Sequence, residues 1–177
     1  MTIKLEFPSE KREKDAMKFI AELIGDGSGT DGDSGLNKAE NYGDWIQQKK
    51  DCHNDINVPK EHVPATAYFA IREEDDKIVG MVDLRHYLND YLKESWNGHV
   101  GYSVRPTERR KGYATGMLKL ALEECKGRGI NSVVVGCDED NIGSKKTILN
   151  CGGEFMDRSM QDGKMHLGFK IKLGENN

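Results

Sequence analysis

The sequence predicts a mixed α/β fold in which helices cover both faces of a mostly antiparallel sheet. Three observations support this prediction. Residues 66–73 and 77–86 are two β-rich segments around a short acidic turn, which indicates a hairpin. Apolar residues within 112–129 recur at four-residue spacing, as on the buried face of a helix. The segment 132–137, SVVVGC, is apolar without alternation, which suits a central strand covered on both faces.

The N-terminal part of the chain predicts one strand and two helices. Residues 3–7 alternate apolar and polar side chains, as a half-buried strand does. A helix is expected over 9–24, with Ser9 as its N-cap. A second helix is expected around 41–51, after the glycine- and aspartate-rich loop 25–37. The apolar stripe of the first helix comprises Ala16, Phe19, Ile20, Leu23 and Ile24.

The C-terminal half completes the sheet. Residues 99–104 predict a strand that stops before Pro106, because proline cannot donate a ladder hydrogen bond. A helix over 141–153 ends at a glycine pair, and strands at 154–160 and 164–173 close the chain. In total we expect about six or seven strands and about four helices.

Length and charge limit the classes of function. The chain fits one domain spanning 1–177, a size at which about 70% of the unfolded chain's surface becomes buried. The formal net charge of −4 disfavours a dedicated nucleic-acid binder. No segment approaches the ~20 apolar residues of a membrane helix, and the N-terminus lacks the apolar core of a signal peptide. We therefore expect a cytoplasmic protein without a membrane partner.

The cysteines and acidic residues do not form a metal-binding pattern. The four cysteines lie far apart with no C-x-x-C pair, so we expect reduced thiols. The segment DGSGTDGDSG, residues 26–35, lacks the glycine and glutamate of a calcium loop whether counted from Asp26 or from Asp31. Cys52 and His53 are an isolated adjacent pair. We predict no metal.

The segment RPTERRKGYATGML, residues 105–118, gathers positive charge and glycine where a strand gives way to a helix. Backbone N–H groups at a helix N-terminus attract anions, and Gly112 lets the backbone approach a ligand closely. Arg109, Arg110 and Lys111 add full charges, so the pattern favours a phosphate or pyrophosphate ligand. Neither a Walker A loop nor the G-x-G-x-x-G fingerprint is present. The alternative is a basic loop with no ligand.

The pattern R-x-x-G-x-A, from Arg109 to Ala114, follows a strand that ends in VRP and resembles the acyl-CoA pyrophosphate loop of the GNAT N-acetyltransferase superfamily. Residues 104–153 keep the family's order of strand, loop, helix, strand, asparagine, helix and Gly-Gly. The resemblance covers roughly residues 66–173. It implies a GNAT-like mixed, mostly antiparallel sheet and acetyl-CoA as co-substrate.

The resemblance also implies roles for the cofactor-binding residues. The backbone of Tyr102, Ser103 and Val104 would pair with the pantetheine arm as an added strand does. Thr115 would add its hydroxyl to the pyrophosphate site. The amides of that site belong to Arg109, Arg110, Lys111, Gly112, Tyr113 and Ala114.

The start of the last helix has a further candidate pair. Asn141 stands where the family often places a cofactor-contacting asparagine, and asparagine is also among the best N-caps, so both roles are open. Ser144 follows three residues later as a weaker candidate. In many family members a tyrosine seven residues after the asparagine protonates the leaving sulfur, but this chain has Ile148 there. Either another group is the acid or the thiolate leaves unassisted.

For the general base, His99 is the first candidate because an unperturbed histidine has a pKa of ~6.5. A surface or hydrogen-bonded histidine is the alternative. Asp138 leaves the end of a predicted strand and could orient a cationic amine or act through water, unless it belongs to a solvated acidic turn. His86 and Asp83 are weaker candidates.

Residues 25–65 correspond to the variable region that shapes the acceptor site in this superfamily. Their acidic residues, with Tyr42 and Trp45, suit a cationic amine, and the alternative is a solvated loop with Trp45 in the core. The leading interpretation is an acetyl-CoA-dependent N-acyltransferase, acting by direct attack in a ternary complex on a small-molecule or peptide amine. The runner-up is a catalytically weak or inactive acyl-CoA-binding regulatory module, and a nucleotide or phosphate-ester binder comes third. The resemblance is also compatible with a homodimer.

Overall fold

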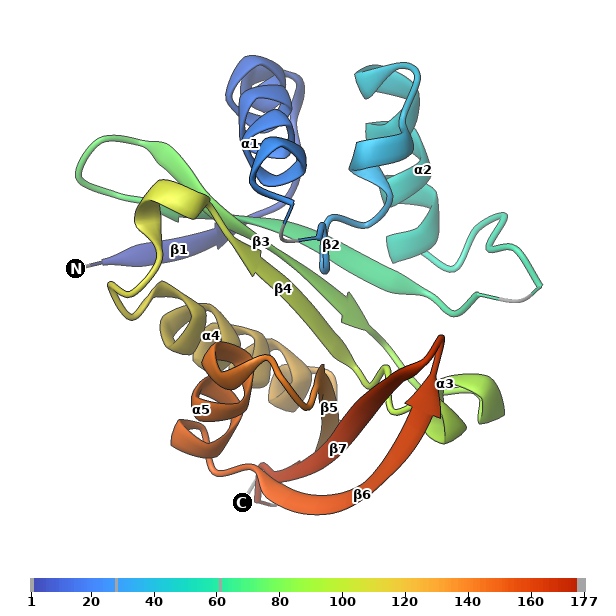
Figure 1. Ribbon diagram of the computed structural model, residues 1–177. Coiled ribbons are helices and arrows are strands. Elements are labelled where there is room, and N and C mark those ends of the chain that lie inside the picture. Colours follow the sequence, from blue (N-terminus) through green and yellow to red (C-terminus); the bar gives the residue numbers. More distant parts are fainter. Residues whose placement is uncertain (1, 28, 61, 175–177) are drawn as a thin grey trace.

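Two antiparallel sheets form the frame of the protein (Figure 1). The computed structural model describes residues 2–27, 29–60 and 62–174. The first sheet has the strand order β1-β2-β3-β4, and the second has the order β5-β7-β6. The strands are β1 (Ile3–Glu6), β2 (Ala65–Arg72), β3 (Lys77–Arg85), β4 (Val100–Val104), β5 (Ser132–Asp138), β6 (Glu154–Gln161) and β7 (Lys164–Lys172).

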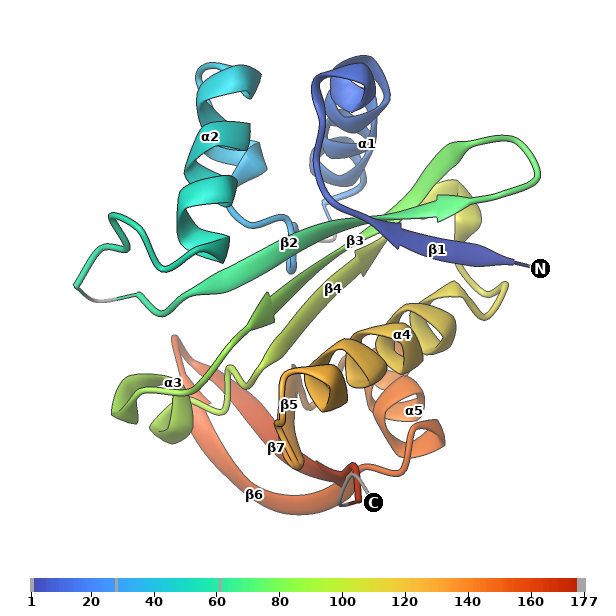
Figure 2. The ribbon, with the colours of Figure 1, turned by 180° about the vertical axis from the view of Figure 1, so that it is seen from behind.

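Helices cover both faces of the first sheet. Figures 1 and 2 show α1 and α2 on one face and α4 on the other, with α5 beside α4 and α3 near the junction of the two sheets. Phe19 and Trp45 lie in the core under α1 and α2, whereas Met117 and Phe169 lie in the core shared by α4 and the second sheet. The helices are α1 (Glu13–Asp26), α2 (Tyr42–His53), α3 (Asp90–Glu94), α4 (Tyr113–Gly127) and α5 (Ile142–Asn150).

This architecture confirms the predicted fold class, a mixed α+β arrangement of seven strands with helices on both faces, counted over the described residues. The predicted hairpin is the β2–β3 pair, and Ala65 pairs with Arg85 at its open end. The C-terminal strands pair antiparallel around the turn at 162–163, as expected. Trp45 is buried, so the expectation that it belongs to the core is confirmed.

Three local expectations differ from the structure. The first helix begins at Glu13 after a 3-10 turn, and Ser9 at the N-cap of that turn makes no side-chain capping bond. Ile24 is 59% exposed, because at 3.6 residues per turn it lies at the edge of the apolar stripe. The short helix α3 was not expected, since five residues are too few for a periodic signal.

The strand β5 also differs from expectation, because its burial alternates and only one face lies in the core. Val133, Val135 and Cys137 are buried against the helices. The opposite face contains Gly136, which packs so closely against the backbone of Trp96 that an added Cβ would lie 1.9 Å from its carbonyl oxygen. An apolar run of this composition does not distinguish one covered face from two.

The two sheets are joined at one end of β4. The His99 N–H donates to the Val134 carbonyl at 2.7 Å, and the Val134 N–H donates to His99 Nδ1 at 3.0 Å. Beyond this junction β4 and β5 belong to different sheets, so β4 is the edge strand of the first sheet. Figures 1 and 2 show the sheets separating from the junction toward α4 and α5. We call the region between the diverging backbones of β4 and β5 the wedge, and the side chains of Tyr102 and Ser144 meet in it.

Candidate active site

The wedge leads to the loop that connects β4 to α4. After the 3-10 turn Pro106–Glu108, Arg110 and Gly112 both adopt left-handed backbone conformations, with φ of 61° and 83°. Such alternation turns successive N–H groups toward one side, and the first N–H groups of a helix have no intrahelical acceptor. Gly112 is the N-cap of α4 and has open space around it. The loop therefore presents unpaired donors and room for an anion.

The basic side chains of this loop differ in their partners. Arg109 donates from Nη1 to Asp26 at 2.7 Å and from Nε to the Val104 carbonyl at 3.3 Å. Lys111 lies 3.0 Å from the buried Glu108. Arg110 is exposed and has no ion pair within the described part of the chain. Of the three cations, Arg110 is thus the one most accessible to a ligand.

The buried Glu108 holds the β4–α4 loop in place through ion pairs. Its carboxylate contacts Arg72 at 2.8 Å and Lys77 at 3.1 Å, besides Lys111. Burial raises the pKa of Glu108, but its bonds to Lys111, Lys77 and Arg72 outweigh that effect and hold the pKa at about 2. Tyr113 is also held here, since its buried hydroxyl accepts a bond from Arg72, so only its backbone faces the loop.

Arg105 fixes the start of the same loop. It is fully buried, lies 2.8 Å from Asp15 and 3.1 Å from Glu22, and packs over the ring of Phe19. All three partners belong to α1. This buried pairing holds the end of β4 against α1 and so positions the loop that follows.

The open edge of β4 exposes alternate backbone groups. The Arg105 N–H donates to the Val79 carbonyl, and Ser103 lies opposite Met81. Because backbone groups alternate along an antiparallel ladder, those of Ser103 face β3, whereas those of Tyr102 and Val104 face the wedge. Of the three residues expected to pair with pantetheine, Tyr102 and Val104 have the required orientation.

The first turn of α5 faces β4 across the wedge. Asn141 caps α5 by accepting the Ser144 N–H at 3.0 Å, so its expected capping role is confirmed. Ser144 Oγ lies 2.8 Å from the hydroxyl of Tyr102, which burial holds at a raised pKa of about 12. The amide NH₂ of Asn141 stays available to a ligand. Ala114 and Thr115 are half-buried in the facing first turn of α4.

Ile148, at the position where many relatives have a tyrosine, is fully buried. A Cβ added to Gly153 would lie 2.5 Å from its side chain. The position is therefore inside the core, where the larger side chain of a tyrosine would require repacking.

His99 lies at the closed end of the wedge. Its ring is buried, which lowers its pKa, and Nδ1 already accepts the Val134 N–H. His86 lies elsewhere, bonded through Nε2 to the buried Thr66, which also contacts His53. Burial lowers the pKa of His86 to about 4. His99 thus helps to join the two sheets through Val134, and His86 holds the buried hydroxyl of Thr66.

Asp138 is different, because it lies at the open end of β5 with a histidine beside it. His166, opposite Asp138 in the β5–β7 pairing, places Nδ1 3.0 Å from its carboxylate, and Lys164 lies 3.6 Å from the same group. Asp31, in the loop between α1 and α2, interacts electrostatically with both Asp138 and His166. Neither His166 nor Asp31 was a candidate from sequence.

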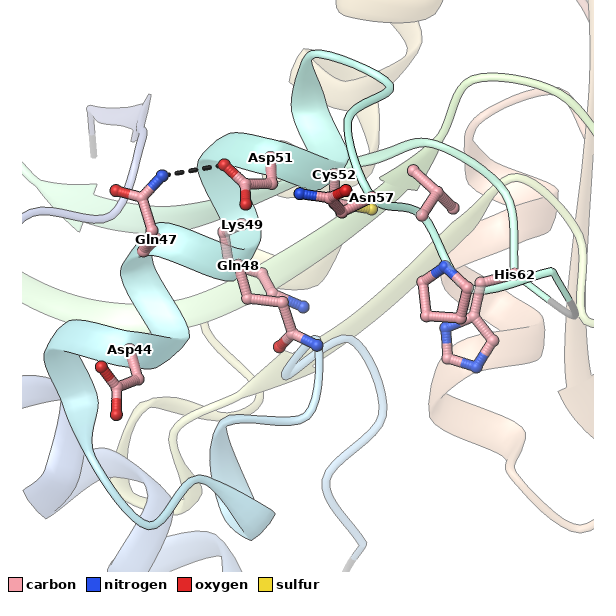
Figure 3. Close-up of a pocket in the computed structure, with 10 residues that line it drawn as sticks. Asp44, Gln47, Gln48, Lys49, Asp51, Cys52, Asn57 and His62 are labelled. Carbon is pink, nitrogen blue, oxygen red and sulfur yellow. Dashed lines mark hydrogen bonds between the residues drawn. The ribbon is translucent and has the colours of Figure 1, made fainter.

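A groove lies beside α2, and its lining includes Asp83 of β3, which pairs with Gly101 of β4. It has a volume of about 840 Å³ and lies between α2, the end of β3 and α3. Asp83 lines it and accepts the Ser34 hydroxyl at 2.5 Å. A smaller pocket of about 310 Å³ lies on the outer side of α2, where Figure 3 shows the bond between Gln47 and Asp51. The groove contains both signs of charge, contributed by Lys38, Glu40, Asp44, Lys49, Asp83 and Arg85.

The aromatic residues expected near the acceptor belong to the core. The Tyr42 hydroxyl donates to the Ser9 carbonyl, and Trp45 Nε1 donates to the Ser34 carbonyl at 3.1 Å.

Within the described residues, no group of three or more histidine, cysteine, aspartate or glutamate side chains could hold a metal ion. Over the same residues, no helix has both the length and the apolar character needed to cross a bilayer.

The pattern of the acetyltransferase (GNAT) family matches residues 36–152, which include β4, the loop and α5. The chain belongs to this family. No curated protein matches the sequence closely enough to count as a relative. The matched residues of this GNAT acetyltransferase contain the β4–α4 loop and the diverging strands β4 and β5.

Solved GNAT structures resemble the whole chain. The ribosomal L7/L12 alpha-N-protein acetyltransferase RimL, in complex with coenzyme A, has a TM-score of 0.72 at 13% identity, covering 97% of this chain and 94% of its own. YncA from Salmonella typhimurium, a putative acetyltransferase with acetyl-CoA, has a TM-score of 0.67 at 14% identity, covering 99% and 96%. The microcin C7 self-immunity acetyltransferase MccE, with acetyl-CoA and AMP, has a TM-score of 0.69 at 19% identity, covering 96% and 92%. At these identities the likeness shows the fold.

Proposed function

We propose that this acetyltransferase binds acetyl-CoA along β4 and transfers its acetyl group to a primary amine by direct attack. The observation that supports this most is the continuity of the open β4 edge with the left-handed turn at Arg110 and Gly112. An extended amide-containing arm would pair with Tyr102 and Val104, and a pyrophosphate would reach the N–H groups at the start of α4. The Asn141 amide would contact the arm from the other side.

Direct attack is favoured because the thiols are poor nucleophiles. Burial raises the pKa of Cys137 to about 11 and that of Cys125 to about 12. A thiol with a raised pKa is protonated near neutrality, and the thiolate is the nucleophilic form. An acetyl-cysteine intermediate is therefore disfavoured, and the amine itself attacks the thioester carbonyl carbon.

The acceptor enters from the groove beside α2. The name of RimL states a protein N-terminus as its acceptor. Another solved neighbour is titled a putative phosphinothricin N-acetyltransferase, which names a small molecule, so both classes of acceptor occur among the neighbours. The mixed charge of the groove suits an acceptor that has polar groups besides its amine. The acidic residues nearest the wedge, Asp31, Asp83 and Asp138, favour a cationic amine over an anionic acceptor.

The test is release of coenzyme A thiol from acetyl-CoA in the presence of primary amines. We would compare spermidine, benzylamine and an Ala-Ser-Lys-Gly peptide with the same peptide after full N-acetylation as the matched control. The proposal predicts thiol release and a mass gain of one acetyl group with at least one primary amine and none with the blocked peptide. Acetyl-CoA binding without turnover would favour the second candidate, a CoA-binding regulatory module, which the buried Ile148 at the tyrosine position supports.

A further inference from the structure

The loop between α1 and α2 touches β4 at two facing glycines. A Cβ added to Gly32 would lie 2.6 Å from both the Gly101 carbonyl oxygen and the Tyr102 nitrogen. A Cβ added to Gly101 would lie 3.3 Å from the Gly32 nitrogen. Gly32 has a φ of +76°, which favours glycine at this position. Only a backbone-to-backbone approach without side chains permits this contact.

This contact places Asp31 next to Tyr102, on the part of the wedge where the thioester would lie. Asp31 directly precedes Gly32, and Tyr102, which lies against Gly32, has backbone groups that face the wedge. The thioester lies at the end of the pantetheine arm that is farthest from the pyrophosphate, so it would lie near Tyr102 rather than near Gly112. Asp31 is thus the acidic residue that the fold brings to the β4 side of the proposed thioester position.

The other side of the wedge supplies charges that act on Asp31. Asp138 at the end of β5 and His166 and Lys164 on β7 are within electrostatic range, as is Asp33 from its own loop. Protein atoms packed around Asp31 raise its pKa most, and Asp138 raises it further, whereas His166 and Lys164 lower it. The side chain still reaches solvent, so an incoming molecule can contact it. Raising the pKa of a carboxylate makes it a better proton acceptor near neutrality.

We propose that Asp31 is the catalytic base that accepts the proton lost by the attacking amine, with Asp138 and His166 as positioning residues. The inference rests on the proposed amine acetylation. In the step, the lone pair of the neutral amine forms a C–N bond with the thioester carbonyl carbon. The extra proton on nitrogen passes to the Asp31 carboxylate, the C–S bond breaks, and its electron pair leaves with sulfur. The products are the acetamide and coenzyme A, whose thiolate then takes up one proton from solvent.

Two other acidic residues, Asp33 in this loop and Asp26 at the end of α1, are already engaged. Asp33 is buried and accepts the N–H groups of Gly35 at 2.8 Å and Asn37 at 3.0 Å, so it shapes the loop. Asp26 holds Arg109. Asp31 makes no direct hydrogen bond or ion pair within the described residues, which leaves its carboxylate free to take a proton.

The experiment compares Asp31→Asn with Asp140→Asn, a matched loss of an exposed carboxylate on the turn after β5. Calorimetry with acetyl-CoA comes first, and we expect a Kd within about twofold of wild type for both variants. With the best amine of the panel above, Asp31→Asn should lower kcat about 100-fold, which is at the lower end of the range for a general base. Asp140→Asn should stay within twofold of wild type.

The pH profile gives a readout that a structural role would not change. Only the neutral amine attacks, so kcat/KM falls below the pKa of the acceptor amine in every variant. In the wild type it should fall more steeply below the raised pKa of Asp31, which must be deprotonated to act. This additional acid limb should disappear in Asp31→Asn, and in Asp138→Asn it should shift to lower pH, because a like charge is removed. Formate should partly restore turnover in Asp31→Ala by supplying a carboxylate.

A carboxyl-carbon NMR titration of the free protein tests the placement of Asp31 without any turnover. Asp31 should titrate above its ordinary value of 3.8 and return toward that value in Asp138→Asn. Unchanged kcat and an unchanged acid limb in Asp31→Asn would overturn the proposal. Failure of the wild type to bind acetyl-CoA, or to turn over any primary amine, would instead overturn the proposed function.

Discussion

The guanidinium of Arg109 lies 2.7 Å from the carboxylate of Asp26, so the anion-binding loop is tied to the last residue of α1. The same guanidinium covers the Val104 carbonyl at the open edge of β4. A bound pyrophosphate and pantetheine arm would compete for both groups. In the free protein Arg109 is therefore held by Asp26 and Val104, and binding of the ligand would have to break these contacts.

Asp26→Asn should tighten acetyl-CoA binding. The pair is more than one-third exposed on both sides, and such pairs contribute about 0.2–1 kcal/mol. Removing the competing carboxylate should therefore lower Kd up to about fivefold, which calorimetry at constant salt can measure. The neutral control is Asp162→Asn, in the distant β6–β7 turn. A weaker affinity in Asp26→Asn would show that Asp26 instead presents Arg109 to the ligand.

His99 should matter mainly for stability. In His99→Ala the half-buried Val134 N–H loses its acceptor, so the free energy of unfolding should fall by about 1–3 kcal/mol. His99→Asn retains a side-chain oxygen that can accept this bond, so it should recover part of that loss. Urea denaturation measures both variants. If His99→Asn has native stability but has lost turnover, His99 is the base and Asp31 is not.

Ile148→Tyr should not create a catalytic acid. The position is fully buried beside Gly153, and adding atoms to a packed core costs about 1–3 kcal/mol. We expect a lower melting temperature and an unchanged or reduced kcat, with Ile148→Leu as the volume-conserving control. An increase in kcat would mean that the tyrosine side chain reaches the wedge.

Glu6 should make stability depend on pH in the acid range. Its bidentate hydrogen bond to the buried Arg12 lowers its pKa from 4.5 to about 2. A depressed pKa in the folded state stabilises the protein above the unfolded value, and this contribution is lost as the pH falls from about 4.5 toward 2. The free energy of unfolding of Glu6→Gln should therefore vary less with pH over that window than that of wild type.

Urea denaturation at several pH values between about 5 and 3 measures this effect. The exposed Glu10→Gln, from the neighbouring 3-10 turn, is the control and should follow the wild-type slope. Parallel slopes for all three proteins would contradict the role of the Glu6–Arg12 pair.

The sequence predicts the parts of the site that lie close together along the chain. The loop from Arg109 to Ala114 and the cap at Asn141 follow from local patterns, because glycine, cap and strand-to-helix signals act within a few residues. The strands follow from local patterns for the same reason, the hairpin from β-rich segments around a short turn and residues 132–137 from an apolar run. Their sheet order does not, because it depends on contacts between distant segments.

Asp31 and His166 could not be predicted for that reason. His166 reaches Asp138 only through the β5–β7 register, and Asp31 reaches β4 only through the contact of Gly32 with Gly101. No pattern in the segments around Gly32 and Gly101 predicts that these two residues lie in contact. His99 is a candidate from the sequence because it is a histidine at a strand end, whereas its bond to Val134 depends on the fold.

The most direct test of the account is calorimetric titration of acetyl-CoA into wild type, Gly112→Asn and Gly112→Asp. Asparagine and aspartate are nearly the same size and both tolerate the left-handed backbone at φ 83°, with open space around the added side chain. The pair therefore differs mainly in one negative charge at the proposed pyrophosphate cradle. We expect wild type and Gly112→Asn to bind with affinities within about fivefold, and Gly112→Asp to bind at least about tenfold more weakly than Gly112→Asn. No binding by the wild type, or equal affinities for the two variants, would contradict the account.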